Sequence, residues 1–291
     1  MKESFVEHRF TAKASDLIGK CNEIVEGYLA QGLRLTLRQL YYQCVTRNLF
    51  PNVERSYKNL SSLLSDARLA GLVDWAAIED RVRVPRHPPE FDSLDDLVDA
   101  ALNSFRLPRW KGQPNYCECW VEKDALSGVI APLARELHVT LSVNRGYSSQ
   151  SAMYEAAKRF IDHGDADCTI LYLGDHDPSG EDMVRDVRDR MRTFGASVHV
   201  EKIALTMDQI EEHDPPPNPA KMTDPRAGEY VAKHGNESWE VDALPPDVLQ
   251  GLIRESISRL VDQDLLDDML AKEEKDKEAL KKALSSVRRK K

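Results

Sequence analysis

"LYLGDHDPSGEDM", residues 171–183, joins an apolar run to a helical pattern through two aspartates, Asp175 and Asp177. The apolar run stops at Gly174 and predicts a buried strand, and Pro178 then begins the helical pattern. Carboxylates held this close repel each other unless one is protonated or a cation lies between them. Carboxylate oxygens suit Mg²⁺, which takes few protein ligands and keeps several waters. The stretch therefore suggests a metal site, although two aspartates at a strand end are a weak signal alone.

Strand and helix patterns alternate around this stretch, which predicts an α/β fold with a mostly parallel sheet and helices on both faces. The expected strands are 116–122, 139–144, 168–175 and 197–205, with helices over 125–137, 151–164 and 179–195. Functional groups in such sheets gather beyond the carboxyl ends of the strands. Glu122 ends one predicted strand, and Asp175 and Asp177 lie at the end of another. These three carboxylates are the expected metal ligands, and a helical C-terminus is expected to follow the sheet.

The N-terminal part has a different pattern, with helices expected over 12–31, 37–50, 57–70 and 75–81. Thr36 and Gln39 form a capping-box pattern before the second helix. Helices followed by a short β-like piece predict a helix-turn-helix or winged-helix domain. We expect this domain over 1–90, a linker region over 91–114, and the metal-binding α/β domain with its helical extension over 115–291.

Composition narrows the class of protein. The chain has 291 residues, 41% of them hydrophobic and 31% charged, as expected for a globular protein with a sizeable core. No apolar run is long enough to cross a membrane, and no secretion signal is visible. Five scattered cysteines suit reduced thiols in a cytoplasm. The chain carries a net charge of −9, yet residues 33–86 hold nine basic and five acidic residues, so positive charge is concentrated where DNA contacts are expected.

"TLRQLYYQ", residues 36–43, is the second informative stretch. Arg38 and Tyr42 are four residues apart, so they share one face of the predicted helix. A phenol is a poor nucleophile at neutral pH, but a guanidinium favours its ionised form and also binds phosphate. Arg38 with Tyr42 is therefore a plausible pair for attack on DNA phosphorus. The alternative is that Tyr41 and Tyr42 only pack a helical core.

Together these stretches resemble a known family. "WVEKDAL" (120–126) and "LGDHDPSGEDM" (173–183) resemble the two halves of a toprim domain. With the tyrosine helix ahead of them, the chain resembles the topoisomerase VI A subunit and its meiotic double-strand-break relatives over most of its length. It is most similar to the compact, stand-alone Mini-A relatives, since it leaves little room for a segment that docks an ATPase subunit. It also contains no Walker-type ATP motif.

The resemblance implies a type IIB topoisomerase-like enzyme that cleaves DNA. It implies that Tyr42 is the nucleophile that becomes linked to a 5′ DNA end, with Arg38 as its supporting residue. It implies Mg²⁺ as the cofactor on an acidic triad of Glu122, Asp175 and Asp177, with Glu122 also counted as catalytic. It further implies a homodimer in which the tyrosine of one protomer meets the metal site of the other. An ATPase B-type subunit in trans is a possible further partner.

Two other interpretations stay open. One is a Mg²⁺-dependent toprim nuclease that uses water, with Tyr42 non-catalytic. The other is a DNA-binding protein whose active site has decayed. Glu240, in "WEVDAL", is a candidate for the edge of the site, although a structural acid is equally compatible with the sequence. Three arginines at 81, 83 and 86 are expected to form a wing that contacts the DNA backbone.

Overall fold

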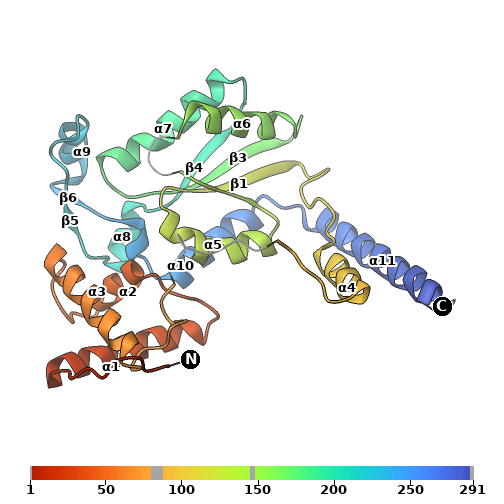
Figure 1. The fold of residues 1–291 in the computed structure, drawn as a ribbon. Coiled ribbons are helices and arrows are strands. Elements are labelled where there is room, and N and C mark those ends of the chain that lie inside the picture. Colours follow the sequence, from red (N-terminus) through yellow and green to blue (C-terminus); the bar gives the residue numbers. More distant parts are fainter. Residues whose placement is uncertain (1, 80–87, 145–147, 289–291) are drawn as a thin grey trace.

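A computed structural model describes residues 2–79, 88–144 and 148–288, with the side chains of 284–288 excepted. Its centre is a parallel four-stranded sheet in the order β2-β1-β3-β4 (Figure 1). The strands are β1 Asn115–Val121, β2 Thr140–Val143, β3 Asp167–Leu173 and β4 His199–Ala204. The predicted α/β class and the predicted parallel sheet are confirmed.

Helices cover both faces of the sheet (Figure 1). One side carries α6 Gln150–Ile161 and α7 Pro178–Thr193, and the other carries α5 Asp124–Glu136 and α10 Pro246–Ser258. The central strands β1 and β3 are buried on both faces beyond their first residues, which explains why their sequences are almost continuously apolar. Parallel strands align their carboxyl ends, and β1 pairs with β3 up to Val121 opposite Leu173. The residues that follow these two strands are therefore neighbours.

Three N-terminal helices form a second hydrophobic core: α1 Ala12–Leu29, α2 Leu37–Thr46 and α3 Glu54–Leu69. The predicted capping box of α2 is present, since the Thr36 hydroxyl accepts from the Gln39 backbone and the Gln39 side chain accepts from the Thr36 backbone. The helix ends at Thr46, earlier than expected, and Asn48 follows with a left-handed φ of 55°.

The winged-helix assignment is not confirmed. The three expected basic wing residues lie within 80–87, outside the described residues. The helix expected over 75–81 is absent from its described part, 75–79, which forms a turn and a bridge between Ile78 and Leu35. The Asp74 carboxylate accepts a hydrogen bond from the Ala76 backbone at 2.8 Å, a local contact that competes with a helix.

A return segment brings the C-terminal part back to the tyrosine helix. It contains β5 Asn218–Pro219, α9 Ala227–His234, β6 Glu237–Ser238 and the 3₁₀ turn η1 Val241–Ala243, and it follows α8 Met207–His213. Ala243 of η1 packs into the N-terminal core, so η1 lies between α2 and the sheet domain. This contact places residues from both ends of the chain around one site.

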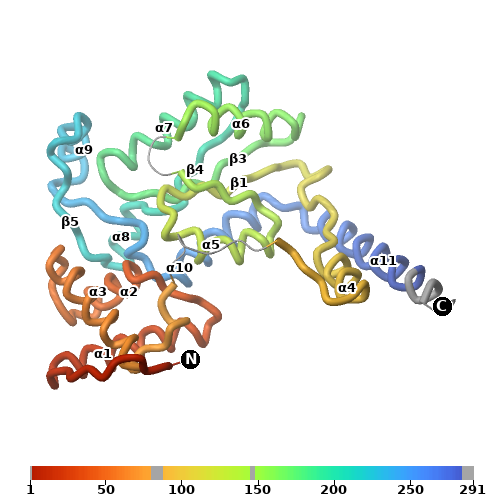
Figure 2. Tube along the Cα trace, in the orientation of Figure 1, coloured from red at the N-terminus to blue at the C-terminus, as the bar shows by residue number. Residues whose placement is uncertain are grey.

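The expected helical C-terminus is confirmed by α10 and by α11 Gln263–Arg288, which extends beside α4 Leu94–Ser104 away from the sheet (Figure 2). The Glu273 carboxylate of α11 is buried, pairs with Arg109 at 2.9 Å and accepts from the Leu107 backbone at 2.7 Å. Within the described ranges, no helix has the length and apolar character required to cross a membrane.

Candidate active site

The carboxyl ends of β1 and β3 bring Glu122 and Asp175 into contact. The Glu122 backbone donates to the Leu173 carbonyl at 2.9 Å, and the Glu122 carboxylate accepts from the Asp175 backbone at 3.1 Å. A Cβ atom on Gly174 would lie 2.9 Å from that carboxylate and 2.6 Å from the Tyr172 ring. With any larger residue at position 174, the Glu122 carboxylate or the Tyr172 ring would have to move. Glu122 and Asp175, which the sequence placed at the ends of two strands, are thus neighbours in the structure.

Asp177 lies at the start of α7 and acts as its N-cap. Its Oδ1 accepts from the Gly180 backbone at 2.6 Å and from the Ser179 hydroxyl at 2.8 Å. Its other oxygen, Oδ2, lies 4.0 Å from the Lys221 ammonium. Asp177 is therefore held in a fixed position with one carboxylate oxygen used by the helix terminus.

Lys123, the residue after Glu122, extends into a cluster of three acids. Its ammonium lies 2.9 Å from Asp175 Oδ2, 3.0 Å from Glu240 Oε2 and 3.2 Å from Asp242 Oδ1. Asp242 is completely buried, whereas the Glu240 side chain is 24% exposed. The positive charge of Lys123 thus lies between the strand-end acids and the return segment.

Arg38 contacts the same two acids from the opposite side. Its Nε lies 2.9 Å from Asp242 Oδ2, and its Nη2 donates to Glu240 Oε2. The same Nη2 lies 3.4 Å from the Tyr42 hydroxyl, and the guanidinium lies over the Tyr42 ring. A continuous set of polar contacts therefore connects Tyr42 to Asp175 within one chain, although the two residues are far apart in the sequence.

The two adjacent tyrosines have different environments. The Tyr41 hydroxyl donates to Asn52 Oδ1 at 2.9 Å, and its ring packs on Phe50 and Tyr57. Tyr42 instead directs its hydroxyl toward Arg38. Tyr41 is thus a packing residue, whereas Tyr42 is the tyrosine whose hydroxyl lies in the charged cluster.

The electrostatics of the cluster follow from burial and opposite charge. Burial raises the pKa of Asp175 to about 6 in spite of Lys123, and burial also raises the pKa of Glu122. Burial would raise the pKa of Glu240 as well, but Lys123 and Arg38 outweigh it and hold that pKa at about 2. Burial, with the nearby charge of Glu240, raises the pKa of Tyr42. The Tyr42 phenol is therefore neutral in this arrangement.

His176, between the two aspartates, contacts the return segment. Its Nδ1 lies 2.8 Å from the Tyr230 hydroxyl, and its ring packs against His234 of α9. Burial lowers the pKa of His176 to about 4, so this imidazole is neutral at pH 7. His176 thereby anchors α9 beside the loop that carries Asp175 and Asp177.

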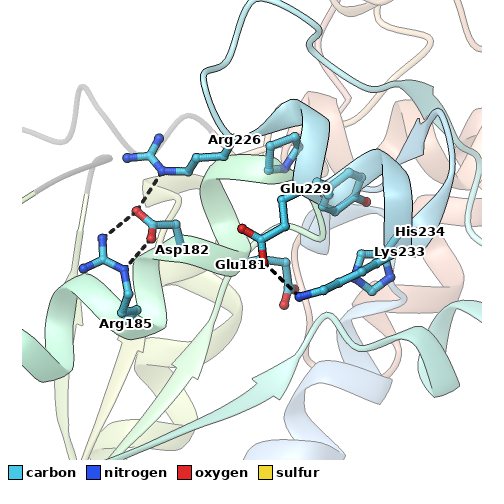
Figure 3. Close-up of a pocket in the computed structure, with 9 residues that line it drawn as sticks. Glu181, Asp182, Arg185, Arg226, Glu229, Lys233 and His234 are labelled. Carbon is cyan, nitrogen blue, oxygen red and sulfur yellow. Dashed lines mark hydrogen bonds and ion pairs between the residues drawn. The ribbon is translucent and has the colours of Figure 1, made fainter.

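A cavity of about 340 Å³ lies between α7 and α9 next to this loop (Figure 3). Its wall contains ion pairs from Asp182 to Arg226 and to Arg185, at 2.9 and 2.7 Å, and a third from Glu229 to Lys233 at 3.1 Å. These pairs offset positive and negative charge around the cavity. It therefore lacks the single-sign surface expected of a phosphate or metal site.

The predicted metal ligands are partly assembled. Glu122 and Asp175 touch, and Asp177 lies two residues further on, but Lys123 and the start of α7 each use carboxylate oxygens. Over residues 2–79, 88–144 and 148–288, no three His, Cys, Asp or Glu side chains are grouped to hold a metal ion. The magnesium site stays a prediction.

Two charged residues of the cluster, Lys123 and Asp242, were not expected from the sequence. Lys123 follows Glu122 directly, and Asp242 is two residues after Glu240, a spacing that offered a signal for a shared role. Comparison of the chain with models of protein families and with curated proteins gives no match. The residues of this cluster are therefore the features of the molecule that point to a function.

Proposed function

We propose that this protein is a Mg²⁺-dependent DNA-cleaving enzyme of the topoisomerase VI A type. Tyr42 is its nucleophile, Arg38 supports the tyrosine and the phosphate, and Glu122, Asp175 and Asp177 form its acidic site. The carrying observation is the set of contacts from Tyr42 through Arg38, the return-segment acids and Lys123 to Asp175. A nucleophile and a metal site must lie close together to act on one phosphate.

The chemistry of the donor set suits magnesium, although Lys123 and the Val241 backbone use both oxygens of Asp175 in the structure. All three candidate ligands offer carboxylate oxygens, the ligand type that Mg²⁺ prefers. Gly174 leaves the space in which the Glu122 carboxylate lies, and Asp177 keeps Oδ2 outside the contacts that cap α7. When bound, the cation would offset the negative charge that develops on a phosphodiester during cleavage.

The reaction is a transesterification. The Tyr42 hydroxyl loses its proton and its oxygen forms a bond to phosphorus. The bond from phosphorus to the 3′ oxygen breaks, and that oxygen takes up a proton. The guanidinium of Arg38, 3.4 Å from the Tyr42 hydroxyl, favours the phenolate and can bind a non-bridging phosphate oxygen. We further propose DNA as the substrate and a homodimer as the working form, in which each Tyr42 acts with the acidic site of its own chain and not, as the resemblance implied, with that of the other protomer.

A second candidate is hydrolysis by a metal-activated water, with Tyr42 as a packing residue. One observation favours it: Tyr42 is only 4% exposed, and burial raises the pKa of its phenol, which disfavours the nucleophilic form. The two candidates share the acidic site and differ only in the role of Tyr42.

Supercoiled plasmid cleavage with matched tyrosine variants separates these candidates. Wild type, Tyr42→Phe, Tyr41→Phe and Asp177→Asn are compared in Mg²⁺ and in EDTA. Transesterification predicts that Tyr42→Phe and Asp177→Asn abolish cleavage and that Tyr41→Phe retains it. Cleavage by Tyr42→Phe at the wild-type rate, with loss in Asp177→Asn, would establish the hydrolytic candidate instead.

A further inference from the structure

One oxygen of Glu240 accepts hydrogen bonds from two cationic side chains that come from different parts of the chain. Glu240 Oε2 accepts from Arg38 Nη2 of α2 and from Lys123 Nζ, at the entry to α5, at 3.0 Å. Asp242 bridges the same two cations through both of its oxygens and is completely buried. Arg38 and Lys123 thus lie close enough to bind one negatively charged oxygen between them. In this structure that oxygen is Glu240 Oε2.

The two acids differ in how readily they could leave. The buried carboxylate of Asp242 accepts a hydrogen bond from Lys123 through Oδ1, and its Oδ2 lies 2.9 Å from Arg38 Nε without hydrogen-bond geometry. Moving this carboxylate would separate a buried charge from both cations. The Glu240 side chain is 24% exposed, and its contacts with Arg38 and Lys123 both use Oε2. Glu240 is therefore the acid that another anion can replace, while Asp242 keeps the two cations in place.

The position also lies between the two parts of the proposed reaction centre. Arg38 Nη2, which contacts Glu240, is 3.4 Å from the Tyr42 hydroxyl, and Lys123 Nζ is 2.9 Å from Asp175 Oδ2. An anion held where Glu240 Oε2 lies would be next to the tyrosine on one side and to the acidic site on the other. Guanidinium and ammonium groups bind phosphate oxygens as they bind carboxylates.

We propose that Arg38 and Lys123 form a phosphodiester-binding site, which Glu240 occupies until DNA displaces it. This inference deepens the proposed function and rests on it. Lys123 becomes a phosphate-positioning residue, and Glu240 becomes an internal competitor that keeps the site closed in the absence of DNA. The charge pattern explains why a strongly acidic segment lies against the tyrosine helix of a protein proposed to bind DNA.

The test measures DNA binding without metal, so that no cleavage is required. A fluorescein-labelled duplex of about three helical turns is titrated in EDTA by fluorescence anisotropy at several salt concentrations. Glu240→Gln removes the competitor, and Glu237→Gln, at the exposed first position of β6, removes the same charge three residues away. We expect Glu240→Gln to bind about three- to tenfold more tightly than Glu237→Gln, with a salt slope steeper by about 0.9 for one extra phosphate contact.

A second set of variants tests whether the two cations cause the tighter binding. Adding Lys123→Met or, separately, Arg38→Gln to Glu240→Gln is expected to abolish the gain, while urea titration verifies that each protein is folded. Equal affinity of Glu240→Gln and Glu237→Gln would overturn the inference, as would a gain that survives both cation variants. Tighter binding without any covalent complex in Mg²⁺ would reject the proposed tyrosine chemistry and leave the binding site supported. A covalent complex without tighter binding would reject only the site.

Discussion

Gly180→Ala tests the geometry of the loop that carries Asp175 and Asp177. A Cβ atom at this buried position in the first turn of α7 would lie 2.2 Å from the Asp175 carbonyl oxygen. Real Cβ atoms essentially never approach another atom within 3.0 Å, so the backbone at Asp175 must move. Alanine normally stabilises a helix by about 1 kcal/mol over glycine. Here overpacking costs about 1–3 kcal/mol or more, and the shifted loop weakens the cap on α7.

We expect Gly180→Ala to lower the free energy of unfolding by about 2 kcal/mol and the Tm by roughly 5 °C. Gly251→Ala is the matched control, because Gly251 is an exposed position of α10 where an added Cβ would meet nothing within 4 Å. That control should gain about 0.5–1 kcal/mol. Urea titration followed by far-UV circular dichroism measures both. A Gly180→Ala protein as stable as the wild type would refute the described packing of this loop.

Three further predictions concern the charged cluster. Lys123→Met should destabilise the protein by about 3 kcal/mol in urea titration, because it leaves Asp242 with Arg38 alone and removes the cation that lies 2.9 Å from the Asp175 carboxylate; an unchanged midpoint would contradict the described ion pairs. Because the pKa of Asp175 is raised to about 6, the folded state binds an extra proton below that pH. Between pH 7 and pH 5 the free energy of unfolding of the wild type should therefore rise by about 1 kcal/mol relative to that of Asp175→Asn. Parallel plots of unfolding free energy against pH for the two proteins would argue against the burial of this acid. Mg²⁺ at about ten times its Kd should stabilise the wild type by about 1.4 kcal/mol, and Asp177→Asn, which keeps a good N-cap, should lose this gain; equal thermal shifts in both proteins would remove Asp177 from the metal site.

Local patterns explain which parts of the fold could be predicted. The near-continuous apolar runs of β1 and β3 follow from burial on both faces of a parallel sheet. The capping box at Thr36 depends on residues three apart, as does a second one that the structure contains at Thr206. The contact of Glu122 with Asp175 follows from the parallel direction of β1 and β3, which the sequence predicted, together with the direct pairing of these two strands.

Long-range contacts explain what could not be predicted. The short β5–β6 pair and α9 lie in and after a proline-rich stretch, 215–219, and α9 packs on His176 through tertiary contacts. The roles of Lys123 and Asp242 depend on η1 returning to α2, which no local pattern announces. The choice between Tyr41 and Tyr42 likewise required the positions of Asn52 and Arg38.

The most direct test of the central claim is to locate the covalent bond. Protein incubated with DNA and Mg²⁺ is denatured, the DNA is digested with nuclease, and tryptic peptides are analysed by mass spectrometry. Cleavage after Arg38 and Arg47 releases the peptide 39–47, which contains both tyrosines. The proposed mechanism predicts a nucleotide attached to Tyr42 through a phosphodiester, located by fragmentation and absent from Tyr42→Phe. Cut DNA with free ends and an unmodified peptide would contradict it, as would a nucleotide on Tyr41.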